Sequence, residues 1–227
     1  MTSRHPEQEI FKFITGDFEA AWNGLAGTAD SHRGNFLFAL LAMILLEWVC
    51  RLCSNEANAL LDFSKALQQI EPRYFTQLDD GIKSPGFTLP GVGPDPLKNL
   101  LSALWDLIRN GNAHEYQDIF VALTDGKHWA LRLLGVDHGH SLHVVGEKRS
   151  SLRHLTCSFD RDGDLALTVH PGVLFLDIRD AVRNSSLLNR GLVPKPFARP
   201  RNQKEYQFSS TQLKEALQKG GFIQVDK

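Results

Sequence analysis

The stretch NFLFALLAMILLEWVCRLC, residues 35–53, decides the fold of this chain. The eleven residues from Phe36 to Leu46 are all apolar, and Glu47 and Arg51 are the first charged residues after them. A membrane span needs about 20 predominantly apolar residues, whereas runs of about 10 to 14 are typical of helices in a protein core. We therefore predict the central buried helix of a helical bundle and no membrane segment.

The flanking stretches predict the other helices of this bundle. Apolar residues recur near a helical period in residues 6–25, 55–70 and 97–110. Between the last two of these segments, eight of the residues from 78 to 96 are Gly or Pro, which predicts a long loop. Because this loop leads directly into the segment 97–110, we expect it to act as a flap near the end of that helix.

The second half of the chain has a different pattern. From Trp129 onward, four short β-like runs follow one another, HWALRLLGV, SLHVVG, LRHLTCSF and LALTVHPGVLFLDI, and an Asp162-Gly163 pair predicts a hairpin turn. Helices followed by strands predict an α+β chain. We expect a helical bundle at 1–127 with its long loop at 78–96, and a β-containing region at 128–227 with a basic, Pro-rich linker and a short helix at about 211–219.

Composition limits the function. A net charge of −1 gives no overall attraction to duplex nucleic acid, and the polar N-terminus lacks a secretion signal, so a cytoplasmic location is expected. The three cysteines are expected to be free thiols. Two metal-ligand patterns occur, and neither has ligand spacing strong enough to favour a metal, so no cofactor is expected. They are Asp137, His138, His140 and His143, and Cys50 with Cys53, His154 and Cys157.

The stretch DLIRNGNAHEY, residues 106–116, carries the candidate chemistry. On an unbroken helix, Arg109 and His114 would point about 140° apart. Gly111 can end the helix in a left-handed conformation, which Asn110 also tolerates, so a break there would turn both side chains toward one cleft. Arg149 and His154 repeat the five-residue spacing, in a segment of loop and strand, and we interpret that repeat as chance.

This stretch resembles the Arg-polar-x-x-x-His signature of HEPN domains, the higher eukaryote and prokaryote nucleotide-binding superfamily, over roughly residues 8–125. The resemblance maps Arg109, Asn110 and His114 onto the signature. It implies a compact helical bundle that carries the motif late in the domain. Many such proteins are metal-independent ribonucleases of toxin or defence systems whose sites form across a dimer interface, and others are non-catalytic modules that bind nucleotides or partner proteins.

The sequence therefore predicts an RNA endonuclease that acts as a homodimer on single-stranded RNA, with an antitoxin or defence protein as a further partner. An imidazole can move a proton on the ribose or the leaving oxygen, and a guanidinium can stabilise charge on the phosphate. A non-catalytic binding or regulatory module is the alternative. Glu47 either supports the motif from the apolar helix or lies at that helix's surface, and the sequence leaves both open.

Overall fold

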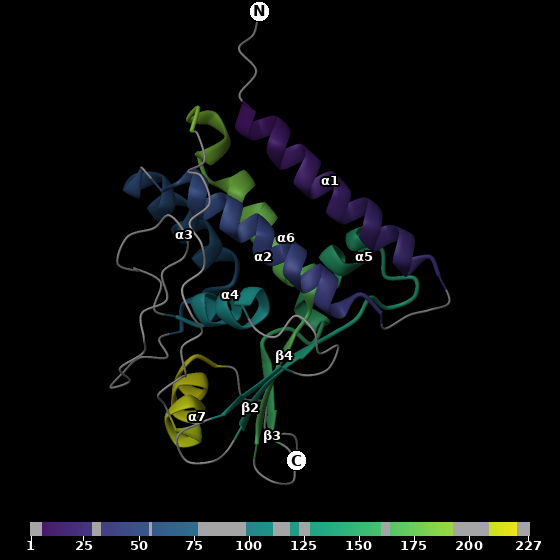
Figure 1. Ribbon diagram of the computed structural model, residues 1–227, viewed down its shortest axis with the longest axis vertical. Helices are drawn as coiled ribbons and strands as arrows, with labels where there is room; N and C mark the ends of the chain where they lie inside the picture. Colours follow the sequence, from purple (N-terminus) through teal and green to yellow (C-terminus); the bar gives the residue numbers. More distant parts are fainter. Residues whose placement is uncertain are drawn as a thin grey trace, which may run out of the picture.

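The computed structural model describes residues 6–28, 33–54, 56–76, 99–110, 119–122, 128–159, 164–192 and 209–221. Within these ranges the chain forms α-helices and a mixed β-sheet (Figure 1). The helices are α1 (Pro6–Ala26), α2 (Asn35–Leu52), α3 (Ala57–Ile70), α4 (Leu100–Asn110), α5 (Leu142–Glu147), α6 (Pro171–Asn184) and α7 (Ser210–Lys219). Three 3-10 turns join them, η1 (Pro72–Phe75), η2 (Arg149–Ser151) and η3 (Leu187–Asn189).

Helices α1 to α4 confirm the bundle predicted from the apolar periodicity. Of the described helices, α2 alone is long and apolar enough to cross a membrane, but eleven of its eighteen residues are buried by the rest of the chain. That burial is typical of a core helix. Helices α1 and α2 run antiparallel, since Phe11 stacks on Trp48 near one end and Phe18 meets Phe38 near the other.

The sheet has four strands in the order β1-β2-β4-β3. Its strands are β1 (Ile119–Ala122), β2 (His128–Leu133), β3 (Thr156–Phe159) and β4 (Leu165–Val169). β3 and β4 pair antiparallel, as expected for the predicted hairpin, whereas the β2–β4 pair is parallel. All five residues of β4 are buried, as is typical of a strand covered on both faces. Strands were predicted only after residue 128, whereas β1 lies before that residue.

One predicted β-like run, and the end of another, are helices instead. SLHVVG forms the short helix α5, whose N-terminus is capped by the Ser141 side chain accepting from the amide of Val144. The end of the last run, from Pro171, forms α6, which begins with Pro at a first-turn position and is capped by His170. Residues 173–178 are all buried, so the run shows no amphipathic period that would distinguish a helix from a buried strand.

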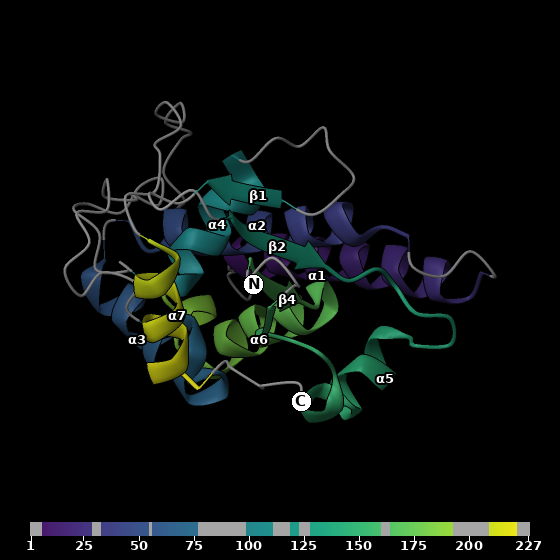
Figure 2. The same ribbon diagram turned by 90° about the horizontal axis from the view of Figure 1, so that it is seen from below.

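Helix α6 joins the two predicted regions because it packs against α2 and α3. Its Phe175 stacks on Phe18 of α1 with ring centroids 3.6 Å apart, and one hydrophobic cluster includes residues from both halves of the chain. Figures 1 and 2 show α5 and α7 at opposite ends of the molecule. α5 lies against the C-terminal end of α1, where Asn23 accepts from the amide of Leu142.

Several predictions fall on other parts of the chain. The loop at 78–96, the Asp162-Gly163 turn and most of the basic linker lie outside the described residues. Within the described start of that linker, Arg190 is paired with Glu56 and Asp62. The predicted C-terminal helix is confirmed as α7, which begins with a capping box formed by Ser209 and Gln212.

Candidate functional site

Two of the three signature residues lie at the end of α4. Arg109 and Asn110 are in the last turn of that helix, and His114 falls among residues 111–118, outside the described part of the chain. Of Arg109 and Asn110, the structure describes the backbone and not the side chains. Leu101, Leu104 and Ile108 are buried, so the helix that carries the motif is anchored in the core. The convergence of Arg109 and His114 on one cleft stays a prediction.

Glu47 is buried, with only 5% of its surface exposed, so the interpretation as a residue at the helix surface is wrong. Its Oε1 accepts a hydrogen bond from Nη2 of Arg51 at 2.5 Å, one helical turn away. A buried carboxylate needs such a partner, because an unpaired charge inside a protein is costly. The sequence predicted this requirement for Glu47, and the structure identifies Arg51 as a partner.

The second Arg-x-x-x-x-His match is assembled into one buried polar cluster. Arg149 and His154 lie on two sides of Asp177 from α6: Nη1 of Arg149 donates to Oδ1 of Asp177 at 2.8 Å, and Nε2 of His154 is 3.9 Å from Oδ2. Tyr74 of η1 lies between His154 and Asp177 and is fully buried. We call Tyr74, Arg149, His154 and Asp177 the buried cluster. The spacing repeat interpreted as chance therefore belongs to one structural unit.

The hydrogen bonds of the buried cluster fix the direction of each proton. The backbone N–H of His170 donates to Nδ1 of His154 at 3.1 Å, so a neutral His154 carries its proton on Nε2. Nε2 of His154 lies 2.7 Å from the hydroxyl oxygen of Tyr74 and donates its proton to it. The Tyr74 hydroxyl in turn donates to Oδ2 of Asp177 at 3.0 Å. Asp177 then accepts from both Tyr74 and Arg149.

Burial dominates the electrostatics of this cluster. It lowers the pKa of His154 well below its ordinary value, with a smaller contribution from the nearby His170, and it raises the pKa of Tyr74 well above its ordinary value. Burial also raises the pKa of Asp177 to about 7, although Arg149 acts in the opposite direction. The neutral forms of His154 and Tyr74 are therefore favoured. The cluster's polar groups bind one another, so its chemistry suits holding η1, η2 and α6 together.

Arg149 connects the buried cluster to the surface. A second donor, Nη2, binds Oδ2 of Asp180 at 2.8 Å, and about a quarter of the Arg149 side chain is exposed. The guanidinium lines a hollow of about 340 Å³ between α1, α5 and α6, together with Arg179 and Glu147. Arg149 is therefore the one member of the buried cluster with a part of its side chain at the surface.

His170 caps α6 next to the buried cluster. Its Nδ1 accepts from the amide of Val173 at 3.3 Å, and its ring lies beside Trp22. Its Nε2 is buried and has no hydrogen-bond partner within the described ranges. Burial lowers the pKa of His170 to about 4, so the neutral ring is the form that fits this environment.

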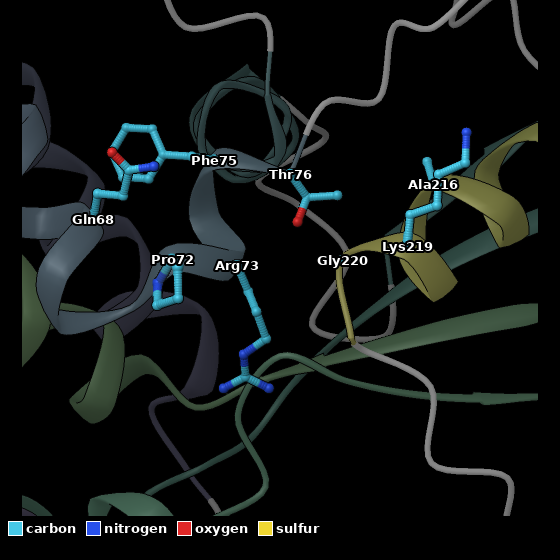
Figure 3. A pocket seen from close by; sticks show the side chains of 8 residues that line it. All are labelled: Gln68, Pro72, Arg73, Phe75, Thr76, Ala216, Lys219 and Gly220. Atoms are coloured by element: carbon cyan, nitrogen blue, oxygen red, sulfur yellow. The ribbon is translucent and has the colours of Figure 1, made fainter.

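A second hollow, of about 400 Å³, lies between η1 and α7 (Figure 3). In Figure 3 the Arg73 side chain extends from η1 toward the strands. Nε and Nη2 of Arg73 donate to Oε1 and Oε2 of Glu71 at 2.7 and 2.5 Å, and Nη1 donates to the carbonyl of Leu155 at 3.3 Å. Leu155 has a φ of 51°, a left-handed conformation that costs energy for a branched residue. Arg73 thus binds a strained turn next to His154.

The two metal-ligand patterns of the sequence do not form clusters of possible ligands. Within the ranges that the structure covers, no group of three or more His, Cys, Asp or Glu side chains could hold a metal ion. Cys50, Cys53 and Cys157 are buried and form no disulfide, which confirms the expected thiols. Burial raises the pKa of Cys53 and of Cys157 to about 12, so both thiols remain protonated at neutral pH.

Comparison of the chain with protein-family models, with curated proteins and with solved structures finds no match. The site is therefore interpreted from its own residues. Four residues around the buried cluster, Tyr74, Asp177, His170 and Arg73, were not singled out from the sequence. Of the buried cluster, the sequence analysis drew attention only to Arg149 and His154, through their spacing and through the pattern of His154 with three cysteines.

Proposed function

We propose that this protein is a metal-independent endoribonuclease that uses Arg109, Asn110 and His114. The observation that carries the proposal is the position of the motif: Arg109 and Asn110 occupy the last turn of α4. A helix held by Leu101, Leu104 and Ile108 in the core gives the motif backbone a fixed position. Fixed reacting groups are what catalysis by positioning requires. The motif's resemblance to the HEPN signature supplies the reaction class.

The chemistry needs only two kinds of group. An imidazole can take the proton from a ribose 2′-hydroxyl or give one to the leaving oxygen, and this is the role proposed for His114. The guanidinium of Arg109 stabilises the charge that develops on the phosphate, and Asn110 orients the phosphate by hydrogen bonding. Attack by the 2′-oxygen leaves a 2′,3′-cyclic phosphate on one product and a 5′-hydroxyl on the other.

A second copy of the chain completes this site in the proposal. Each chain contains one such motif at the end of α4, so a dimer supplies two imidazoles and two guanidiniums to one phosphate-sized cleft. The buried Glu47–Arg51 pair supports this arrangement from α2, which packs against α4. Single-stranded RNA is the proposed substrate, because unpaired bases can be splayed into a narrow site. A cytoplasmic location and an antitoxin or defence partner belong to the same proposal.

The test is cleavage of a panel of single-stranded RNAs in EDTA, with analysis of product ends. We expect cyclic-phosphate products from the wild type and a rate lower by about 10² to 10⁴ for His114→Ala. Arg109→Ala should cause a comparable loss. His143→Ala is the matched control, because His143 lies on α5 with 78% of its side chain exposed, and it should cleave like the wild type.

The opposite results are equally specific. A wild-type protein that leaves every RNA intact, or a His114→Ala variant as active as the wild type, would overturn the catalytic proposal. Retained RNA or nucleotide binding by an inactive wild type would then support the alternative of a non-catalytic module.

A further inference from the structure

Helices α1 and α2 carry a stripe of exposed apolar side chains. Phe13 is 69% exposed, Leu37 53%, and Ile10 and Ile44 39% each. Ile14 and Leu41 are partly buried and pack beside them against the core. We call these six residues the α1–α2 stripe. Large aliphatic and aromatic side chains with this much exposure on neighbouring helices mark a surface that binds another molecule.

The stripe follows one exposed face on each of two helices that pack side by side. Leu37, Leu41 and Ile44 are spaced by four and three residues, so they follow one face of α2. Ile10, Phe13 and Ile14 follow one face of α1 in the same way. The contact of Phe11 with Trp48 places residues 10–14 of α1 level with the second half of α2. Figure 1 shows the antiparallel pair along one side of the molecule.

The size of the stripe agrees with an interface between proteins. The four exposed residues leave on the order of a few hundred Å² of apolar surface in contact with water, the size at which an exposed patch is often functional. A standard interface buries about 800 Å² on each partner, and somewhat more than half of that area is apolar. The stripe thus supplies most of the apolar area that one side of a dimer needs.

We infer that the α1–α2 stripe is the surface through which two copies of this chain associate. The stripe residues carry no charge, so a two-fold axis can place the stripe of one copy on the stripe of the other, residue i on j and j on i, without like charges meeting. Glu9 and Lys12 on α1 form a pair at the rim and offer both signs to the partner. An anionic membrane fits less well, because α1 carries Glu7, Glu9, Asp17 and Glu19 against the single base Lys12.

Helix α2, which carries three residues of the stripe, contacts α4, the helix that carries Arg109 and Asn110. Glu47 and Arg51 follow Ile44 by one and two turns of α2, and α2 packs against α4. The inference deepens the proposed function, because the composite site needs a second copy. The stripe itself is an observation that does not depend on the motif, so its test uses association rather than cleavage.

The chain offers a matched pair of variants for this test. Leu37 in the stripe and Leu61 on α3 are similarly exposed, at 53% and 51%. By sedimentation velocity at 1 to 100 µM, a range that brackets ordinary dimer affinities, we expect the wild type and Leu61→Glu to dimerise. Leu37→Glu should raise the dissociation constant by about 10- to 100-fold, since each dimer loses two buried leucines. Unchanged circular dichroism of both variants will show that they fold.

A cross-linking experiment locates the contact directly. The three native cysteines are buried, so a cysteine introduced at position 44 is accessible while the native thiols are protected. Ile44→Cys should form a disulfide-linked dimer under mild oxidation, and Leu61→Cys should not. A wild type that is monomeric at 100 µM, or dimers that survive Leu37→Glu unchanged, would overturn the inference. So would binding of the monomer to phosphatidylserine vesicles through the stripe.

These results are separable from the ribonuclease test. Dimers that Leu37→Glu dissociates support the stripe even if the wild type cleaves no RNA. Cleavage by a strictly monomeric wild type supports a nuclease and rejects both the stripe and the composite site.

Discussion

Replacing Tyr74 by Phe tests the buried cluster by removing one oxygen atom. The hydroxyl accepts from Nε2–H of His154 and donates to Oδ2 of Asp177, and all three side chains are at least 96% buried. A buried polar group that loses its partner costs about 1 to 3 kcal/mol. His154 and Asp177 each lose a partner, although Asp177 keeps Arg149. We therefore expect the free energy of unfolding to fall by about 2 to 5 kcal/mol. Domains of this kind are stable by only about 5 to 15 kcal/mol.

Urea unfolding followed by tryptophan fluorescence measures this loss. A double-mutant cycle with His154→Leu should give a coupling energy of about 0.5 to 3 kcal/mol, since the two groups bind each other directly. Ser151→Ala is a suitable control, because its exposed hydroxyl binds a local carbonyl within the same segment. A Tyr74→Phe variant destabilised by less than about 0.5 kcal/mol, or a coupling energy near zero, would refute the view that this cluster holds η1, η2 and α6 together.

Two further predictions concern the same junction. His170 has a pKa of about 4 in the folded protein, against about 6.5 in an unfolded chain. Its contribution to the free energy of unfolding is therefore complete above pH 6.5 and is lost as the pH falls toward 4, by about 3 kcal/mol in all. Asp177, with its pKa raised to about 7, has the opposite effect on stability between pH 4 and 7, so the measurement compares the wild type with His170→Asn, which retains a helix-capping acceptor. The free energy of unfolding of His170→Asn should fall less steeply with acid than that of the wild type. Equal slopes for the two proteins would contradict the prediction. Gly172→Ala should destabilise by about 1 to 3 kcal/mol in urea unfolding, because the new Cβ would lie 2.8 Å from the buried ring of Trp22, whereas Gly146→Ala, with its nearest contact at 3.6 Å, should be neutral or stabilising.

The helical part of the fold was predictable from the apolar pattern of α1, α3 and α4. Their apolar residues recur at the helical period, and α2 was recognised by an apolar run too long for an ordinary strand. α6 was missed for the opposite reason, since the continuous burial of residues 173–178 removes the period. The first-turn Pro171 and the capping His170 were the available signals for a helix start. α5 was missed because its six residues include two valines.

The polar groups were less predictable than the helices. Glu47 could be recognised as needing a partner, because it is an acid within an apolar helix. The buried cluster brings together Tyr74, His154 and Asp177, which are separated by 80 and 23 positions, and only the tertiary fold places them in contact. Periodicity describes one element at a time and therefore carries no information about such pairings. The roles of Arg109, Asn110 and His114 stay predictions.

The position of α6 also has a consequence for how this protein is made. α2 leaves the ribosome early, yet α6, which covers it, ends only at Asn184, more than 130 residues later. Until then, the apolar run from Phe36 to Leu46 is not completely covered, and a growing chain exposes it to solvent or to a chaperone. Contacts so distant in sequence are typical of slow folding. A nascent chain that stalls before α6 should therefore aggregate or be degraded rather than accumulate as a folded N-terminal fragment.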